Sequence, residues 1–284
     1  MEEKRPIVAF MYDFDKTLSP KDMQEYGFIP NIGMSGPEFW DLCNALAKRY
    51  GMDDILAYML AMVQESRGKM LITREVFTAL GKTVELFPGV LSWFDRVNAY
   101  GEAAGLSVEH YIISSGLKEI ILGTPIAKYF REIYSAEFCY DERGVPFWPA
   151  MAVNYTSKTQ FLYRINKGVF DVTEHKALND YTPPGRHRVP FSNMIYLGDG
   201  LTDVPCMKLV RQNGGHSIAV YQGDSQTAEG LIEHGRVNFI APADYTGGSK
   251  LERTVFAVLD RIKADDLTTR MYLHDLAQAV PPEA

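Results

Sequence analysis

Acidic or hydroxyl side chains stand just after three short apolar runs of the sequence. They are Asp13 and Asp15 after residues 7–12, Ser114 after residues 111–113, and Asp199 and Asp203 after residues 194–197. Several carboxylates in one crevice repel each other and need a cation, and oxygen ligands favour a hard ion such as Mg²⁺. Lys158, expected at a helix start, adds positive charge for an anionic substrate.

The apolar runs predict the elements that must bring these side chains together. Continuous apolar runs are typical of strands buried on both faces, as in parallel sheets. The expected strands are 7–12, 111–113, 194–197, 217–220 and 237–240. Their alternation with helical patterns predicts an α/β fold, a doubly wound parallel sheet with a Rossmann-like core. Ligands of such sheets bind at the carboxyl ends of the strands, where these groups would converge.

A different pattern fills residues 19–88. Ser35 and Glu38 have capping-box spacing, and apolar residues then recur at helical intervals. This predicts an inserted all-helical cap domain at 19–88 and a catalytic core at 1–18 and 89–284. Within the core we expect helices at 117–122 and 126–130 and from near residue 157, a hairpin over 137–154 and a loop over 171–190.

Composition narrows the class of protein. The 284 residues are 46% apolar and 23% charged, which is typical of globular chains. A net charge of −7 argues against nonspecific binding to nucleic acid or to an anionic membrane. No apolar run approaches the ~20 residues that span a bilayer. Three widely spaced cysteines and an N-terminus unlike a signal peptide predict a cytoplasmic protein. Nothing in the sequence indicates an oligomeric state.

The motifs and their order resemble those of the haloacid dehalogenase-like hydrolases. Residues 13–17 (Asp-Phe-Asp-Lys-Thr) resemble the first motif, and Ser114 and Lys158 resemble the second and third. Residues 198–203 (Gly-Asp-Gly-Leu-Thr-Asp) resemble the fourth. The helical insert directly after the first motif resembles the phosphoserine-phosphatase-like branch of the family.

The resemblance implies a role for each motif residue. Asp13 would be the nucleophile that forms an aspartyl-phosphate, and Asp15 the general acid and then the general base. Phosphatases of the family carry this second aspartate, whereas its dehalogenases lack it. Mg²⁺ would be bound by Asp13, the backbone carbonyl of Asp15, and Asp199, with Asp203 close by or in the second shell. The side chain of Ser114, the amides of Ser115 and Gly116, and Lys158 would hold the phosphate.

Two of these assignments have competitors in the sequence. Ser115 competes with Ser114, but the family pattern places the phosphate ligand on the first residue after the strand. Lys167 competes with Lys158, but the family's lysine tends to open the helix before the fourth motif. Both arguments favour the earlier residue of the pair.

The expected function is a Mg²⁺-dependent phosphomonoesterase (a phosphatase) acting on a small-molecule phosphate monoester. The alternatives are a phosphotransferase or mutase with the same intermediate, a non-catalytic protein that binds a phosphorylated metabolite, and a protein phosphatase. Among cap residues, Asp22, Arg67 and Arg74 are candidates for substrate specificity, whereas Trp40 is expected to pack in the insert. Asp22 stands where phosphoserine phosphatases carry a glutamate, which argues against serine-phosphate specificity.

Overall fold

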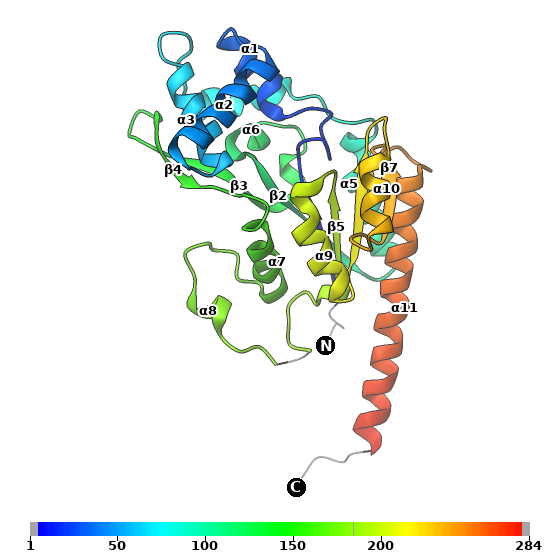
Figure 1. The fold of residues 1–284 in the computed structure, drawn as a ribbon. Helices are drawn as coiled ribbons and strands as arrows, with labels where there is room; N and C mark the ends of the chain where they lie inside the picture. Colours follow the sequence, from blue (N-terminus) through cyan, green and yellow to red (C-terminus); the bar gives the residue numbers. More distant parts are fainter. Residues whose placement is uncertain (1–4, 184, 280–284) are drawn as a thin grey trace.

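A seven-stranded sheet forms the centre of the part of the chain, residues 5–183 and 185–279, that this computed structural model describes (Figure 1). The strand order is β4-β3-β2-β1-β5-β6-β7. The strands are β1 (Ile7–Tyr12), β2 (Ser107–Leu117), β3 (Phe130–Tyr140), β4 (Pro146–Met151), β5 (Met194–Gly198), β6 (His216–Tyr221) and β7 (Phe239–Pro242). Neighbouring strands are parallel except β4, which runs antiparallel to β3. The predicted doubly wound parallel sheet is confirmed.

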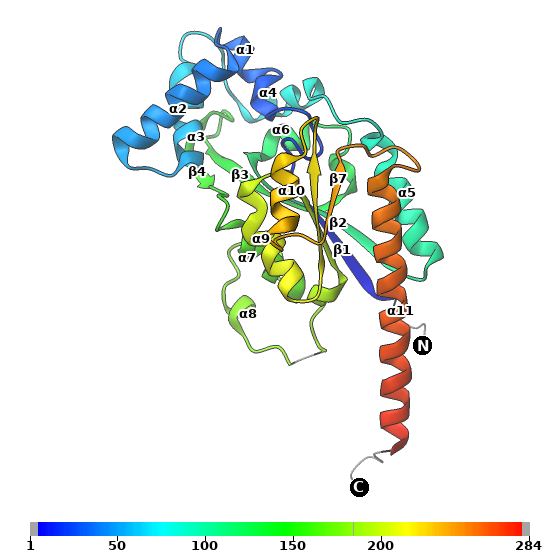
Figure 2. The same ribbon diagram turned by 45° about the vertical axis from the view of Figure 1, so that its right-hand side comes forward.

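The two faces of the sheet are covered by different helices (Figure 2). Alternate residues of β1 point to opposite faces, as the pleat requires. Val8, Phe10 and Tyr12 join the cluster that includes α5 (Val90–Ala103) and α11 (Lys250–Ala279). Ala9 and Met11 join the cluster built by α7 (Lys158–Lys167), α9 (Val204–Gln212) and α10 (Gln226–Glu233). Burial on both faces explains why β1 is apolar except for the hydroxyl of Tyr12, which is hydrogen-bonded to Trp93 and His110.

Residues 19–88, all of which are described, contain helices and no extended strand. The helices are α1 (Phe28–Asn31), α2 (Gly36–Tyr50), α3 (Asp54–Glu65) and α4 (Arg74–Leu80), with short 3₁₀ turns at Met23–Glu25 and Gly81–Thr83. The predicted capping box opens α2, since Ser35 and Glu38 exchange hydrogen bonds. The predicted helical insertion is therefore confirmed. The predicted division into a cap domain (19–88) and a core (1–18 and 89–284) stays a prediction. Residues 1–4, 184 and 280–284 of that core lie outside the described part.

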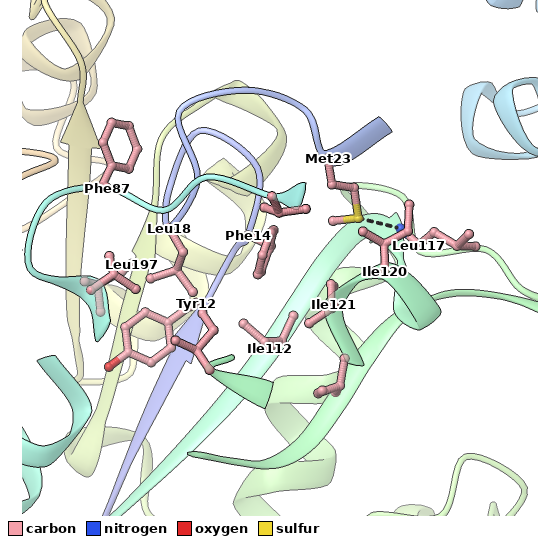
Figure 3. Packing of buried hydrophobic residues seen from close by; sticks show 14 of the residues in the cluster. Tyr12, Phe14, Leu18, Met23, Phe87, Ile112, Leu117, Ile120, Ile121 and Leu197 are labelled. Atoms are coloured by element: carbon pink, nitrogen blue, oxygen red, sulfur yellow. Dashed lines mark hydrogen bonds between the residues drawn. The ribbon is translucent and has the colours of Figure 1, made fainter. Parts of the chain in front are cut away.

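The start of the insert is anchored on the sheet beside the first motif (Figure 3). Phe14, Leu18 and Met23 pack with Ile120 of α6 (Lys118–Leu122) in one buried cluster. The backbone N–H of Leu117 donates to Met23 Sδ at 3.2 Å. This contact holds the chain leaving β1 close to the end of β2, where the predicted phosphate-binding residues lie.

Several predicted boundaries were wrong. Residues 126–130 form a 3₁₀ turn (Ala127–Tyr129) followed by the start of β3, because Phe130 already pairs with β2. Leu117 ends β2 rather than opening a helix. The 171–190 segment contains one short helix, α8 (Lys176–Asn179), and β7 lies two residues later than expected. The hairpin is formed by β3 and β4 around residues 141–144.

The sequence analysis did not anticipate α11. Leu251, Val255, Val258, Leu259 and Ile262 recur at helical spacing and are buried against the core, so the signal was present. The C-terminal half of α11 extends past the body of the molecule (Figure 1). Neither α11 nor any other helix in the described residues is long and apolar enough to cross a bilayer.

Candidate active site

The carboxyl end of β1 lies between the ends of β2 and β5, and this places the motif residues at one edge of the sheet. The N–H of Asp13 donates to Leu197 O at 2.9 Å, which fixes Asp13 one residue past the strand. A cavity of about 720 Å³ opens there. Predicted site residues that line it are Asp13, Asp15, Asp22, Ser114, Ser115, Lys158 and Asp199. The expected convergence is observed.

Lys158 joins the first and fourth motifs. It is the first residue of α7, and its ammonium lies 2.8 Å from Asp13 Oδ1 and 2.7 Å from Asp203 Oδ1. All three side chains are buried. Burial lowers the pKa of Lys158, but the two carboxylates outweigh it, so the pKa is raised and the lysine stays charged. Lys167, the competitor, donates to the carbonyls of Leu178 and Asp180 and does not line the cavity.

Asp203 is held in place by Lys158 and by the hydroxyl of Tyr196, which donates to Oδ1 at 2.7 Å. Its other oxygen, Oδ2, is buried and accepts no hydrogen bond from the described residues. Gly198 is required beside it, since a Cβ at that position would lie 2.4 Å from Oδ2. The Gly-Asp-Gly sequence of the fourth motif therefore gives a buried carboxylate room at the end of β5.

Asp15 lies beside Asp13 under the start of the insert. Its Oδ1 accepts the backbone N–H of Met23 at 2.8 Å. Burial, followed by the charges of Asp22 and Asp13, raises the pKa of Asp15 well above its usual value. A shift in this direction favours the protonated form, which is the form that a general acid needs.

Lys16 turns the chain between Asp15 and the insert. Its φ of 58° lies in the left-handed region, where no other non-glycine residue of the described chain lies. The Lys16 ammonium pairs with Asp22 at 2.9 Å. Such backbone strain persists only where surrounding contacts enforce it, and it is common in active sites. The sequence analysis missed this role of Lys16.

Carboxylates crowd the end of β5 as well. Burial, followed by the charges of Asp13 and Asp203, raises the pKa of Asp199 to about 8. Burial raises the pKa of Asp13 to about 6, although Lys158 opposes the shift. Burial is the main cause of both shifts, and neighbouring carboxylate charge that one lysine does not fully balance adds to them.

The residues present fit a divalent cation. Carboxylate oxygens of Asp13, Asp199 and Asp203 lie within 4.8 Å of one another. The oxygen-only donor set suits Mg²⁺, and the buried Oδ2 of Asp203 has no other partner among the described residues. Asp15 was also predicted to bind the metal, through its backbone carbonyl; its carboxylate is not part of this group.

The end of β2 forms a short polar segment facing the cavity. Ser114 is buried, and its Oγ accepts the N–H of Gly116 at 3.1 Å. Ser115 is half-buried, and its carbonyl accepts the hydroxyl of Tyr58 from α3 at 2.8 Å. The Gly116 amide, expected to hold phosphate, is thus engaged by Ser114.

The three cap residues predicted to set specificity lie in different places. Asp22 lines the cavity. Arg67 lines a separate cavity with Lys69 and Pro146. Arg74 stacks its guanidinium on the ring of Tyr140, 4.3 Å from the centroid. The structure does not bring the two arginines to the Asp13 cavity.

Other residues near the site were missed. Tyr196 lies inside the buried strand β5. Its hydroxyl was the only feature of the sequence that could have marked it as a site residue. Trp40, expected to pack in the insert, and Gln24 and Tyr58 line a small cavity next to Asp15. The spacing of apolar residues predicts that α2 and α3 each bury one face. It does not predict which residues at the border of that face line a cavity against the core.

Residues 10–208 match the haloacid dehalogenase-like hydrolase family. The chain belongs to this family. Over 281 aligned residues it is 30% identical to an uncharacterized protein of Borreliella burgdorferi, covering 88% of this chain and 96% of the relative.

Solved structures share the fold at low identity. A probable phosphoserine phosphatase from Vibrio cholerae has a TM-score of 0.56 at 12% identity, over 92% of this chain and 67% of its own. A phosphoserine phosphatase in apo form has a TM-score of 0.52 at 13% identity, over 84% and 93% of the two chains. A hydrolase of the family from Salmonella enterica serovar Typhi has a TM-score of 0.51 at 19% identity, over 79% and 66%. The resemblance inferred from the motifs is confirmed.

Proposed function

We propose that the protein is a Mg²⁺-dependent phosphomonoesterase that hydrolyses a small phosphorylated metabolite through an aspartyl-phosphate. The observation that carries the proposal is the buried contact of Lys158 with both Asp13 and Asp203, next to a second aspartate, Asp15, whose pKa is raised. A nucleophile, an acid and a positioned cation are the groups that phosphoryl transfer needs.

In the first step an oxygen of Asp13 attacks phosphorus, and the bond from phosphorus to the leaving oxygen breaks. Asp15 gives its proton to that oxygen, so the alcohol leaves neutral. In the second step Asp15 takes a proton from water, whose oxygen attacks phosphorus and releases phosphate from Asp13. Lys158 holds Asp13 in place and offsets the negative charge of the phosphoryl oxygens.

Asp13, Asp199 and the backbone carbonyl of Asp15 would hold Mg²⁺, with Asp203 beside them. The bound ion would neutralise charge on the phosphoryl group. It would also favour the charged forms of Asp13 and Asp199, whose pKa values are raised by burial and by neighbouring carboxylates.

The site's own residues favour catalysis over binding alone. A binding protein needs neither a nucleophile nor an acid, so the pair Asp13 and Asp15 argues against it. A phosphotransferase would use the same residues with an alcohol in place of water.

The three cysteines are unpaired, which agrees with the expected cytoplasmic location.

The test is release of inorganic phosphate from a panel of phosphate monoesters that includes p-nitrophenyl phosphate. Phosphate should be released with Mg²⁺ present. EDTA should abolish release, and added Mg²⁺ should restore it. Full activity after exhaustive chelation would contradict the metal assignment, and phosphate transfer to an added alcohol in preference to water would indicate a transferase.

A further inference from the structure

A second, smaller cavity of about 160 Å³ lies next to the large one, between the core and helices α2 and α3. Asp15, Asp22, Asp54, Ile55 and Ser115 line both cavities, so the two meet at the candidate general acid. A leaving oxygen protonated by Asp15 must lie at this junction. The carbon skeleton attached to that oxygen can therefore enter the smaller cavity while the phosphoryl group stays beside Asp13.

The small cavity is lined by three carboxylic acid side chains. They are Asp15, Asp22 and Asp54, and no lysine, arginine or histidine of the described residues joins them. Lys16 lies nearby, but its ammonium is paired with Asp22. Asp54 is exposed in the first turn of α3, and the described residues give it neither a hydrogen bond nor an ion pair through its side chain. No basic side chain of the described residues pairs with it.

Two further features of the cavity suit a positively charged group. The rings of Trp40 and Tyr58 meet edge to face, with centroids 6.3 Å apart, and both line the cavity. Aromatic rings attract cations that approach their faces. Gln24 is 2% exposed and also lines the cavity, and its Oε1 accepts no hydrogen bond from the described residues. A buried acceptor without a donor is costly unless a bound group supplies one.

We propose that the leaving alcohol of the substrate carries a cationic amine, so that the substrate is a phosphorylated amino alcohol. The inference rests on the proposed phosphatase function. Asp54 attracts the amine, Trp40 and Tyr58 pack against it, and Gln24 accepts a hydrogen bond from it where it has N–H groups.

The size and lining of the cavity limit the substrate further. A water-sized group occupies roughly 30 Å³, so 160 Å³ has room for about five of them. This suits a short aminoalkyl chain. A carboxylate on the leaving group would face acidic side chains without a basic partner, which disfavours amino-acid phosphates such as phosphoserine.

The test compares substrates of matched shape and different charge. The cationic probes are ethanolamine phosphate and choline phosphate, and their neutral counterparts are propyl phosphate and 3,3-dimethylbutyl phosphate. Phosphoserine and phosphoglycolate are the anionic probes. For the wild type we expect kcat/KM for each cationic probe to exceed that of its neutral counterpart on the order of tenfold, with the anionic probes lowest.

Asp54→Asn removes the carboxylate charge while nearly keeping the side-chain shape. It should lower the ratio of cationic to neutral kcat/KM by several-fold or more. Because the same substrate pair is compared in each variant, differences in leaving-group reactivity cancel. Asp41→Asn, an exposed aspartate on α2 that does not line the cavity, is the matched control and should keep the wild-type ratio.

The possible outcomes separate this inference from the function on which it rests. Equal rates on charged and neutral probes, a preference for the anionic probes, or an unchanged ratio in Asp54→Asn would each overturn the amino-alcohol assignment and leave a phosphatase. No phosphate release from any monoester, p-nitrophenyl phosphate included, would overturn both.

Discussion

The cluster around Lys158 and the small cavity beside Trp40 differ in how their charges are satisfied. In the Lys158 cluster, Asp13 and Asp203 are buried and both contact the same ammonium at under 3 Å. In the small cavity, Asp54 is exposed without a side-chain partner, and Gln24 has a buried oxygen without a donor among the described residues.

This difference separates the part of the site that does chemistry from the part that chooses a substrate. Groups that stabilise a transition state work best when they are positioned before the substrate arrives. Groups that recognise a ligand can stay unsatisfied until the ligand supplies the missing partner. Substitutions in the Lys158 cluster should therefore act on every substrate, and substitutions near the small cavity should discriminate among substrates.

Asp13→Asn should have the largest effect, because it removes the nucleophile while nearly preserving shape. We expect no turnover of either an aryl or an alkyl phosphate, and no phosphate bound covalently to the protein. Intact-protein mass measurement and phosphate release would check both. Measurable turnover would remove Asp13 as the nucleophile, provided that deamidation back to aspartate is excluded by mass.

Asp15→Asn should come next, because general acid–base help is worth roughly 10²–10⁴-fold. The loss should be greater for an alkyl phosphate than for p-nitrophenyl phosphate, whose leaving group needs little protonation. The measurement is kcat/KM for the variant and the wild type on both substrates. Equal losses on the two would remove the argument for Asp15 as the acid.

Lys158→Ala should lower kcat on the order of 10²–10³-fold, the usual cost of losing one positioned electrostatic partner. It also leaves two buried carboxylates without their cation, so a thermal melt must establish that the variant is folded. Lys167→Ala is the control and should stay near wild type, since the ammonium of Lys167 donates to the carbonyls of Leu178 and Asp180 and does not line the cavity. If the two results were reversed, the assignment of Lys158 would be wrong.

The same contrast explains what the sequence could predict. Asp13, Ser114 and Asp199 follow apolar strands, and parallel strands bring their carboxyl ends to one edge, so residue type and order were enough. From its position at a helix start, Lys158 was expected to add positive charge for an anionic substrate; its contact with Asp203 was not predicted. Tyr196 could not be found this way, because an apolar strand gives no reason to single out one hydroxyl.

The lining of the small cavity depends on tertiary placement. Trp40 packs in the insert against Phe39 and Tyr58, as expected. That it also lines the cavity beside Ser115 depends on how α2 is placed in the fold, which no local spacing specifies. Arg67 and Arg74 were chosen for charge alone, and the structure gives them other contacts. Helix α11 is a different case, because its periodic apolar residues were present and overlooked.

Tyr58→Phe should have the smallest effect and tests whether α3 helps to hold the end of β2. The Tyr58 hydroxyl donates to Ser115 O at 2.8 Å, and a neutral hydrogen bond of this kind is worth about 0.5–1.5 kcal/mol. Because the variant keeps the ring that lines the small cavity and changes no charge there, we expect an equal effect on every substrate. We expect kcat/KM to fall by a factor of roughly 2–10, since water can reach the half-buried Ser115 in place of the hydroxyl. Tyr50→Phe is the matched control: Tyr50 ends α2, is 54% exposed, and keeps its ring beside Arg49 in the variant. A loss above 100-fold would place Tyr58 among the groups that do chemistry, and no loss at all would show that the end of β2 keeps its position without α3.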